Sequence, residues 1–470
     1  MGTQNKGRTG AAPEALATGG DDRGRHVLAW GRVERRSVPA AGDPQPADVK
    51  ATEPETVGAT QPAGAERAAG VRGVAAGRDG LAEMAATAPT TAESVTAATT
   101  KTGITTTETV TAASLATATV SAPRPTLIGT ITAVIFGVFT ALERLLTGPP
   151  TVPAGSNVTV RTSSLVVGGI RVAADWYYPA SDEPPQRIIF LVHGFLAIGP
   201  MYSTLAATLA EQTDSIVVVP TFSSNPLADG GMWVNGAGMA NAVAQLFVGD
   251  RSALNASALA AGFAQQYGLD PADAVLPTQF VLAGHSAGGA LVSVVSGLLV
   301  DNGAVADLAG VLLLDAVTSG GQLSTALTKL DAYQKQTGRY VPVREIGSPR
   351  NAWNFISNVN AALSNARPDR FNGVVLSGGV HTDSMGGGSA ISQFLVHLLA
   401  GFPTAQNSPA LRELAVSWVK DWFEGITDDG DDLVPGSKIT IVTPKGNATG
   451  TVIGTPVTVP SAAREAELAA

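Results

Sequence analysis

The sequence predicts an α/β fold in which a mostly parallel central sheet is covered by helices on both faces. The main observation is a set of short Val, Ile and Leu runs separated by segments with helical spacing of apolar residues: 187–192, 215–219, 279–283 and 308–314. Strands buried on both faces are almost wholly apolar, and strands that alternate with helices pair in parallel. A parallel sheet of this kind needs helices on both sides.

The pattern continues toward the C-terminus with two more strand-like runs and two amphipathic helices: 340–346, 371–377, 390–399 and 409–423. Before the first buried run, residues 157–178 alternate between polar and apolar on either side of a Gly-Gly pair. This alternation predicts an antiparallel hairpin at one edge of the sheet.

The connection between the second and third buried runs is almost sixty residues long, which exceeds a single β–α connection. We expect helices at 239–247 and 253–267, and a Gly- and Asn-rich loop at 221–238 that carries Met232 and Trp233. Such a loop either caps a functional site or is a plain surface excursion.

The chain outside residues 151–425 has a different composition. Residues 1–124 are dominated by Ala, Thr, Gly and Pro, and we predict disorder because they offer too little apolar surface to offset the entropy of ordering. Residues 125–150 read as an apolar helix and linker. We expect residues 426–470 to form a tail with short strands. The aspartates of 428–432 form either a calcium site or a solvated turn, and the turn is favoured because their spacing matches no known calcium loop.

One segment is a candidate for membrane or envelope association. Residues 126–142 are apolar, although a spanning helix usually needs about 20 such residues. The segment therefore forms a helix packed on the domain, a helix lying at an interface, or an anchor. The polar first 40 residues show no signal-peptide pattern. The sequence does not fix the location of the protein, although it favours the cell envelope or secretion.

The charge and the absence of cysteine exclude several classes of function. A net charge of -9 and a pI near 5.1 without a clustered basic face argue against nucleic acid as a partner. The chain has no cysteine, so disulfides, thiolate catalysis, iron–sulfur clusters and thiolate zinc sites are excluded.

A G-x-S-x-G sequence at Gly284–Gly288 is the strongest functional signal. It follows an apolar strand and precedes an apolar helical run, which is the context of a nucleophile elbow with Ser286 as nucleophile. A serine hydroxyl needs a neighbouring base. Of the five histidines, His381 is the best candidate because it lies in a Gly-rich loop just after the last predicted strand, whereas His397 reads as a core histidine.

The acid that orients the histidine should follow a strand between the serine and the histidine. Asp315 ends an apolar strand, where an unpartnered carboxylate would be costly. Glu345 on the next strand and Asp383, two residues after the histidine, are the alternatives.

Two backbone amides should face the developing oxyanion. We expect them to come from Ala287, the residue after the nucleophile, and from Phe195 in the loop after the first buried strand. His193 in that loop is expected to hold the loop by hydrogen bonds. Phe195, Met232 and Trp233 suggest an apolar acyl site.

These residues resemble the α/β-hydrolase superfamily, in particular its chlorophyllase-like branch, with the bacterial polyester hydrolases and cutinases nearby. The resemblance covers residues 155–425 and rests on four stretches: LVHGFL with MYSTL (191–205), GHSAGG (284–289), LDAV (314–317) and GVHTDSM (379–385). In chlorophyllase-like proteins the acid ends the strand after the elbow, which implies Asp315. Polyester hydrolases carry the acid one strand later and a tryptophan where this chain has Ala316 and Val317, so the match to them is partial.

The sequence thus predicts a serine esterase of the lipase type that needs no metal or cofactor and acts on lipid-like or medium-chain esters. A thioesterase or peptidase with the same triad is an alternative. A non-catalytic envelope binding protein on a hydrolase scaffold is another, although such a protein would usually have lost a triad residue.

Overall fold

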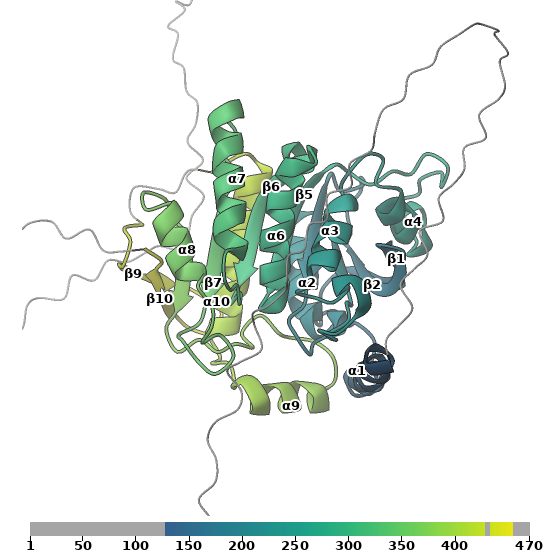
Figure 1. The fold of residues 1–470 in the computed structure, drawn as a ribbon, viewed down its shortest axis with the longest axis horizontal. Coiled ribbons are helices and arrows are strands. Elements are labelled where there is room, and N and C mark those ends of the chain that lie inside the picture. Colours follow the sequence, from purple (N-terminus) through teal and green to yellow (C-terminus); the bar gives the residue numbers. More distant parts are fainter. Residues whose placement is uncertain (1–126, 428–432, 455–470) are drawn as a thin grey trace, which may run out of the picture. The chain divides into compact units, whose positions relative to one another are not determined.

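The computed structural model describes residues 127–427 and 433–454 (Figure 1). The segment predicted to be disordered, 1–124, lies outside the described residues, as do the aspartates of 428–432 and the part of the predicted last strand beyond residue 454.

Ten strands form one sheet in the order β1-β2-β4-β3-β5-β6-β7-β8-β10-β9. The strands are β1 (Thr159–Val167), β2 (Ile170–Tyr178), β3 (Arg187–Val192), β4 (Ile216–Pro220), β5 (Gln279–His285), β6 (Leu308–Leu314), β7 (Val343–Gly347), β8 (Gly373–Leu376), β9 (Lys438–Ile441) and β10 (Ala448–Val452). The six central strands from β4 to β8 are parallel. The β1–β2 hairpin joins β4 antiparallel at one edge, and β10 and β9 extend the other edge antiparallel.

Helices cover both faces of the sheet, so the predicted fold class is confirmed. They are α1 (Leu127–Thr147), α2 (Ser203–Thr213), α3 (Ala237–Gln245), α4 (Ser252–Ala260), α5 (Phe263–Gln266), α6 (Ala287–Asp301), α7 (Gln322–Thr337), α8 (Val359–Ala366), α9 (Ala390–Ala400) and α10 (Asn407–Phe423), with short 3-10 turns η1 (Gly199–Tyr202), η2 (Asp229–Gly231) and η3 (Ala304–Asp307). With a serine at the turn from β5 to α6, this is the α/β-hydrolase fold.

Alternating side chains of the central strands supply two separate cores. In β3, Ile188 and Phe190 pack with α3, α4, α6, α7 and α8 on one face of the sheet. Ile189 and Leu191 pack with α2 and α10 on the other face. This follows from the period of two in a strand, because successive side chains point to opposite faces.

The expected helix 253–267 is two helices in the structure. The first, α4, ends at Ala260, and Gly262 separates it from α5 with a φ of 79°. Glycine adopts this left-handed conformation without the steric cost that a Cβ would bring, so the chain turns there.

Helix α9 departs from the expected arrangement, in which it would cover the sheet. Ser392 is the only buried residue of α9, and its hydroxyl lies 3.0 Å from the Thr147 hydroxyl at the end of α1. His397 is half-buried against the ring of Phe402 and is not a core residue as predicted. Figure 1 shows α1 and α9 at the same end of the strands. Within the described ranges, no helix is both long and apolar enough to cross a bilayer.

Candidate active site

Ser286 occupies the sharp turn between β5 and α6. Its φ of 53° and ψ of -120° are rarely adopted by a residue with a side chain, and such strain is characteristic of functional turns. The Ser286 N–H donates to the Leu314 carbonyl at 3.1 Å, and the Val317 N–H donates to the Ser286 carbonyl at 3.0 Å. The end of β6 and the residues after it therefore hold the strained serine through its backbone.

The glycines of the motif are required by close backbone packing. A Cβ at Gly284 would lie 2.4 Å from the Gly288 carbonyl oxygen, and a Cβ at Gly288 would lie 2.4 Å from the His193 carbonyl oxygen. Both distances are far below van der Waals contact. The turn can pass this close to the end of β3 only because these positions lack a side chain.

The structure brings together the three residues predicted for the triad. His381 Nε2 lies 3.0 Å from Ser286 Oγ, and His381 Nδ1 lies 2.5 Å from Asp315 Oδ2. Asp315 directly follows β6, and His381 lies in the loop after β8. All three residues are buried, with exposed fractions of 8% or less.

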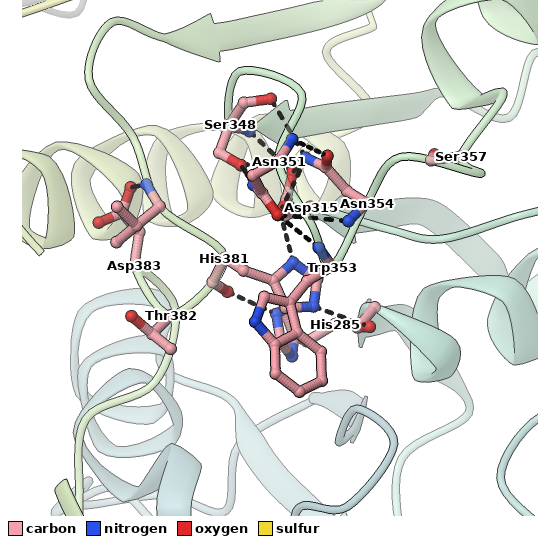
Figure 2. A network of polar contacts seen from close by, with 12 residues as sticks. His285, Asp315, Ser348, Asn351, Trp353, Asn354, Ser357, His381, Thr382 and Asp383 are labelled. Atoms are coloured by element: carbon pink, nitrogen blue, oxygen red, sulfur yellow. Dashed lines mark hydrogen bonds and ion pairs between the residues drawn. The ribbon is translucent and has the colours of Figure 1, made fainter. Parts of the chain in front are cut away.

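The Asp315 carboxylate accepts further hydrogen bonds from the loop after β7 (Figure 2). The Ser348 N–H donates to Oδ1 at 2.8 Å, the Ser348 hydroxyl donates to Oδ2 at 2.9 Å, and the Asn354 amide donates to Oδ1 at 3.1 Å. Burial by itself would raise the pKa of Asp315, but the hydrogen bond and charge of His381 and these donors lower it. Asp315 is therefore ionised at neutral pH.

The alternative acids bond to backbone amides. Glu345 Oε1 accepts the Ala316 N–H at 3.0 Å, and burial together with the charge of Asp315 raises the pKa of Glu345 well above its usual range. Asp383 Oδ2 accepts the Val380 N–H at 2.9 Å, and burial raises the pKa of Asp383 to about 7. It is Asp315 that accepts the hydrogen bond of the His381 Nδ1–H.

The loop after β3 passes directly against the serine. A Cβ at Gly194 would lie 3.1 Å from Ser286 Cβ. The Gly194 N–H donates to the Tyr202 hydroxyl at 3.0 Å, and the Leu196 N–H donates to the Ser224 hydroxyl at 2.9 Å. The amides on either side of Phe195 are thus fixed by side chains.

Ala287 is the first residue of α6, so its N–H has no carbonyl one turn earlier in the helix to donate to. The positive end of the helix dipole lies at the same point. The two predicted amide donors, of Phe195 and Ala287, therefore belong to the two segments that border Ser286, which are the loop after β3 and the start of α6.

His193 and His285 are buried, neutral and linked to the loops of the site. Burial lowers the pKa of His193 to about 4; its Nε2 accepts the Phe222 N–H at 2.8 Å, so its Nδ1–H donates to the Gly194 carbonyl at 2.7 Å. This is the structural role expected for His193.

His285 has a role that the sequence did not reveal. Burial lowers its pKa to about 3. The His381 carbonyl can only accept, so the single ring proton of neutral His285 is on Nε2 and Nδ1 is an acceptor; the Tyr202 hydroxyl, which also accepts the Gly194 N–H, therefore donates to Nδ1 at 2.7 Å. His285 Nε2–H then donates to the His381 carbonyl at 2.8 Å. A continuous chain of hydrogen bonds joins the loop of Phe195 to the loop of His381.

The predicted apolar trio is only partly assembled. The rings of Phe195 and Trp233 meet edge to face with centroids 6.3 Å apart. The Met232 methyl group lies instead 2.8 Å from the position of a Cβ at Gly168, under the β1–β2 turn. Met232 is therefore a neighbour of the hairpin.

An aromatic residue that the sequence did not indicate lies against the catalytic candidate. The Trp353 ring stacks on the His381 imidazole at a centroid distance of 6.2 Å and an angle of 8° (Figure 2). The resemblance to polyester hydrolases would imply a tryptophan after β6, where this chain has Ala316 and Val317. The structure brings one from the loop after β7.

No protein-family model matches the chain, and no curated protein sequence matches it. Solved structures with a similar fold include carboxyl esterase 2 of the fungus Tuber melanosporum, with 14% identity, a TM-score of 0.38, and coverage of 62% of this chain and 98% of that chain. An ester hydrolase from the Lake Arreo metagenome has 15% identity, a TM-score of 0.39 and coverage of 64% and 94%.

An esterase of the archaeon Pyrobaculum calidifontis has 16% identity, a TM-score of 0.35 and coverage of 62% and 93%. Among the residues that the structure describes, no group of three or more His and carboxylate side chains is arranged to hold a metal ion.

Proposed function

We propose that the chain is a serine hydrolase that cleaves carboxylic esters through an acyl-enzyme. The observation that carries the proposal is the unbroken series of hydrogen bonds from Ser286 Oγ through His381 to Asp315, with distances of 3.0 and 2.5 Å. A hydroxyl, a base that can take its proton and a carboxylate that orients the base are what this chemistry needs.

The first half of the reaction uses His381 as a base and then as an acid. Its Nε2 accepts the Ser286 proton while Oγ adds to the ester carbonyl, and the Asp315 carboxylate stabilises the imidazolium. The Ala287 and Phe195 amides donate to the oxyanion, each contributing about 3 kcal/mol of transition-state stabilisation. The tetrahedral intermediate collapses, the C–O bond to the alcohol breaks, and the alcohol leaves with the proton from Nε2.

The second half returns the enzyme to its starting state. His381 Nε2 accepts a proton from water as the hydroxide adds to the acyl carbon. Collapse of this second intermediate breaks the bond to Ser286 Oγ, which takes back the proton, and the carboxylic acid is released. No metal or redox cofactor takes part in these steps.

Lipid-like or medium-chain acyl esters are the proposed substrates. Phe195, in the loop that passes against Ser286, pairs with the ring of Trp233, and the Trp353 ring stacks on His381. Apolar walls of this kind favour an uncharged acyl chain over a charged one.

Labelling with a fluorophosphonate probe, followed by hydrolysis of p-nitrophenyl esters of increasing chain length, tests the proposal. Ser286→Ala should abolish labelling, and His381→Ala should reduce hydrolysis by about 10⁴-fold or more. Ser296→Ala is the matched control, because Ser296 is a buried serine of α6, the helix that follows Ser286, and its hydroxyl donates to the Ser293 carbonyl. It should keep both labelling and hydrolysis.

A wild-type protein that is folded by circular dichroism but takes no label and hydrolyses no ester would refute the proposal and leave a binding protein on a hydrolase scaffold. Labelling that persists in Ser286→Ala would assign the nucleophile elsewhere.

A further inference from the structure

The exposed apolar side chains of the described residues gather at three segments. Of the 23 large apolar side chains that are exposed, six belong to α1, six to residues 391–402 and three to residues 353–356. Soluble monomers rarely expose contiguous apolar surface beyond a few hundred square ångströms unless it binds something. We call these three segments together the apolar face.

Helix α1 turns its apolar side away from the protein. Its exposed side chains recur with helical spacing: Val134, Ile135, Val138, Phe139, Leu142 and Leu145. The half-buried or buried side carries four polar residues, Thr132, Thr140, Glu143 and Thr147, together with Phe136 and Leu146. A helix that packs on a core in water does the reverse.

Helix α9 repeats this inverted arrangement. Ile391, Phe394, Leu395, Leu398 and Leu399 are exposed, and the exposed fraction of Leu399 reaches 71%. The buried side carries Ser392, which meets Thr147 of α1. The Thr147 carbonyl also accepts the Ser389 N–H at 2.9 Å. The two helices therefore touch through polar groups and both direct their apolar side chains outward.

The apolar face is continuous with the candidate active site. The Trp353 indole N–H donates to the Leu399 carbonyl at 2.9 Å, and the same ring stacks on His381. The Thr382 hydroxyl, next to His381 in the chain, donates to the Gly401 carbonyl at 2.7 Å just after α9. Both contacts join the C-terminal end of α9 to the loops that carry the site.

The charge of this face restricts what can cover it. Residues 389–402 contain no Lys, Arg, Asp or Glu. In α1 the only charged residues are Glu143 and Arg144, and burial raises the pKa of Glu143 to about 8. Two points argue against a protein as the partner of this face. Protein interfaces usually have a polar, hydrogen-bonding rim, and a protein bound beside Trp353 would block access to His381. Residues 1–124 carry few large apolar side chains with which to cover it.

We infer that α1, α9 and the loop 353–356 dock the protein on the surface of an uncharged lipid aggregate, from which the ester substrate enters the site. The inference rests on the proposed function for its substrate and deepens it. An amphipathic helix that lies in the plane of a lipid surface buries its apolar side in the lipid. On such a surface the outward-facing apolar side chains of α1 and α9 would be removed from water, which is energetically favourable.

Flotation of the full-length protein with phosphatidylcholine vesicles tests the docking. Leu145→Asp on α1 and Leu398→Asp on α9 should each lower the vesicle partition coefficient about tenfold, because each removes a leucine that enters the lipid on docking and adds a charge. Val275→Asp is the matched control, since Val275 is 65% exposed outside this face, and it should bind as the wild type does. Circular dichroism checks that each variant is folded.

The Ser286→Ala protein separates this inference from the proposed function, because it should float with vesicles although it hydrolyses nothing. Hydrolysis by the wild type should rise when a long-chain ester passes from monomers to aggregates, and Leu398→Asp should lose that rise. A wild type that takes the fluorophosphonate label but neither floats nor prefers aggregated ester would overturn the docking alone. A different result would overturn the docking in favour of a second copy of the chain. Sedimentation would then detect a dimer of the wild type, Leu398→Asp would abolish this dimer, and the wild type would bind no vesicles.

Discussion

Replacing Tyr202 by phenylalanine removes one oxygen atom that connects two loops of the candidate site. Its hydroxyl accepts the Gly194 N–H at 3.0 Å and donates to His285 at 2.7 Å. The tyrosine is fully buried, so the variant leaves two buried polar groups unpaired. Each unpaired group costs about 1 to 3 kcal/mol, and we expect the free energy of unfolding to fall by roughly 2 to 4 kcal/mol.

The same change should slow the reaction. Gly194 precedes Phe195, and His285 fixes the His381 carbonyl at 2.8 Å, so the hydroxyl holds both the loop of the proposed oxyanion donor and the proposed base in place. Misplacement of catalytic groups by about 1 Å can cost 10²-fold, and we expect kcat on a p-nitrophenyl ester to fall by about 10- to 100-fold with little change in KM.

Tyr177→Phe is the control for Tyr202→Phe. Tyr177 is equally buried, and its hydroxyl donates to Ser203, which keeps its own bond to the Pro200 carbonyl. The control should lose about 1 kcal/mol of stability and keep kcat. Urea unfolding and initial rates measure the two effects. A Tyr202→Phe protein with reduced stability but wild-type kcat and KM would refute the positioning role.

Three further predictions concern burial and charge. Ser348→Ala should cost about 1 to 2 kcal/mol at neutral pH and less near about pH 3, because the lowered pKa of Asp315 gives stability that is lost as the pH falls; equal costs at both pH values in urea unfolding would contradict this. Glu345→Gln should gain stability relative to the wild type between about pH 5 and 8, because the raised pKa of Glu345 makes wild-type stability fall as the pH rises; parallel pH profiles would count against it. Gly288→Ala should destabilise by about 3 kcal/mol or more and abolish labelling, because its Cβ would meet the His193 carbonyl; normal labelling and melting temperature would show that the turn can relax.

The sequence by itself determined the features that depend on short stretches of chain. The elbow at Ser286 consists of a strand, a turn of small residues and a helix that follow one another directly. The glycines and the spacing of apolar residues that predict it all lie within one short stretch of the chain. Apolar runs with a single carboxylate at the end predicted the position of Asp315, because parallel strands end at one edge of the sheet.

Only the tertiary structure decided which distant residues support this site. Tyr202 and His285 meet across 83 positions of sequence, and Trp353 reaches His381 from the loop after β7. Such contacts depend on the path of loops, which carries no periodic signal in the sequence.

The direction in which a helix faces was likewise decided by the tertiary structure. The spacing of apolar residues in α1 and α9 shows that each helix has one apolar side, but the same spacing is compatible with that side facing a core or facing outward. The polar contact between Thr147 and Ser392 fixes the polar sides against each other, and the apolar sides are exposed as a result.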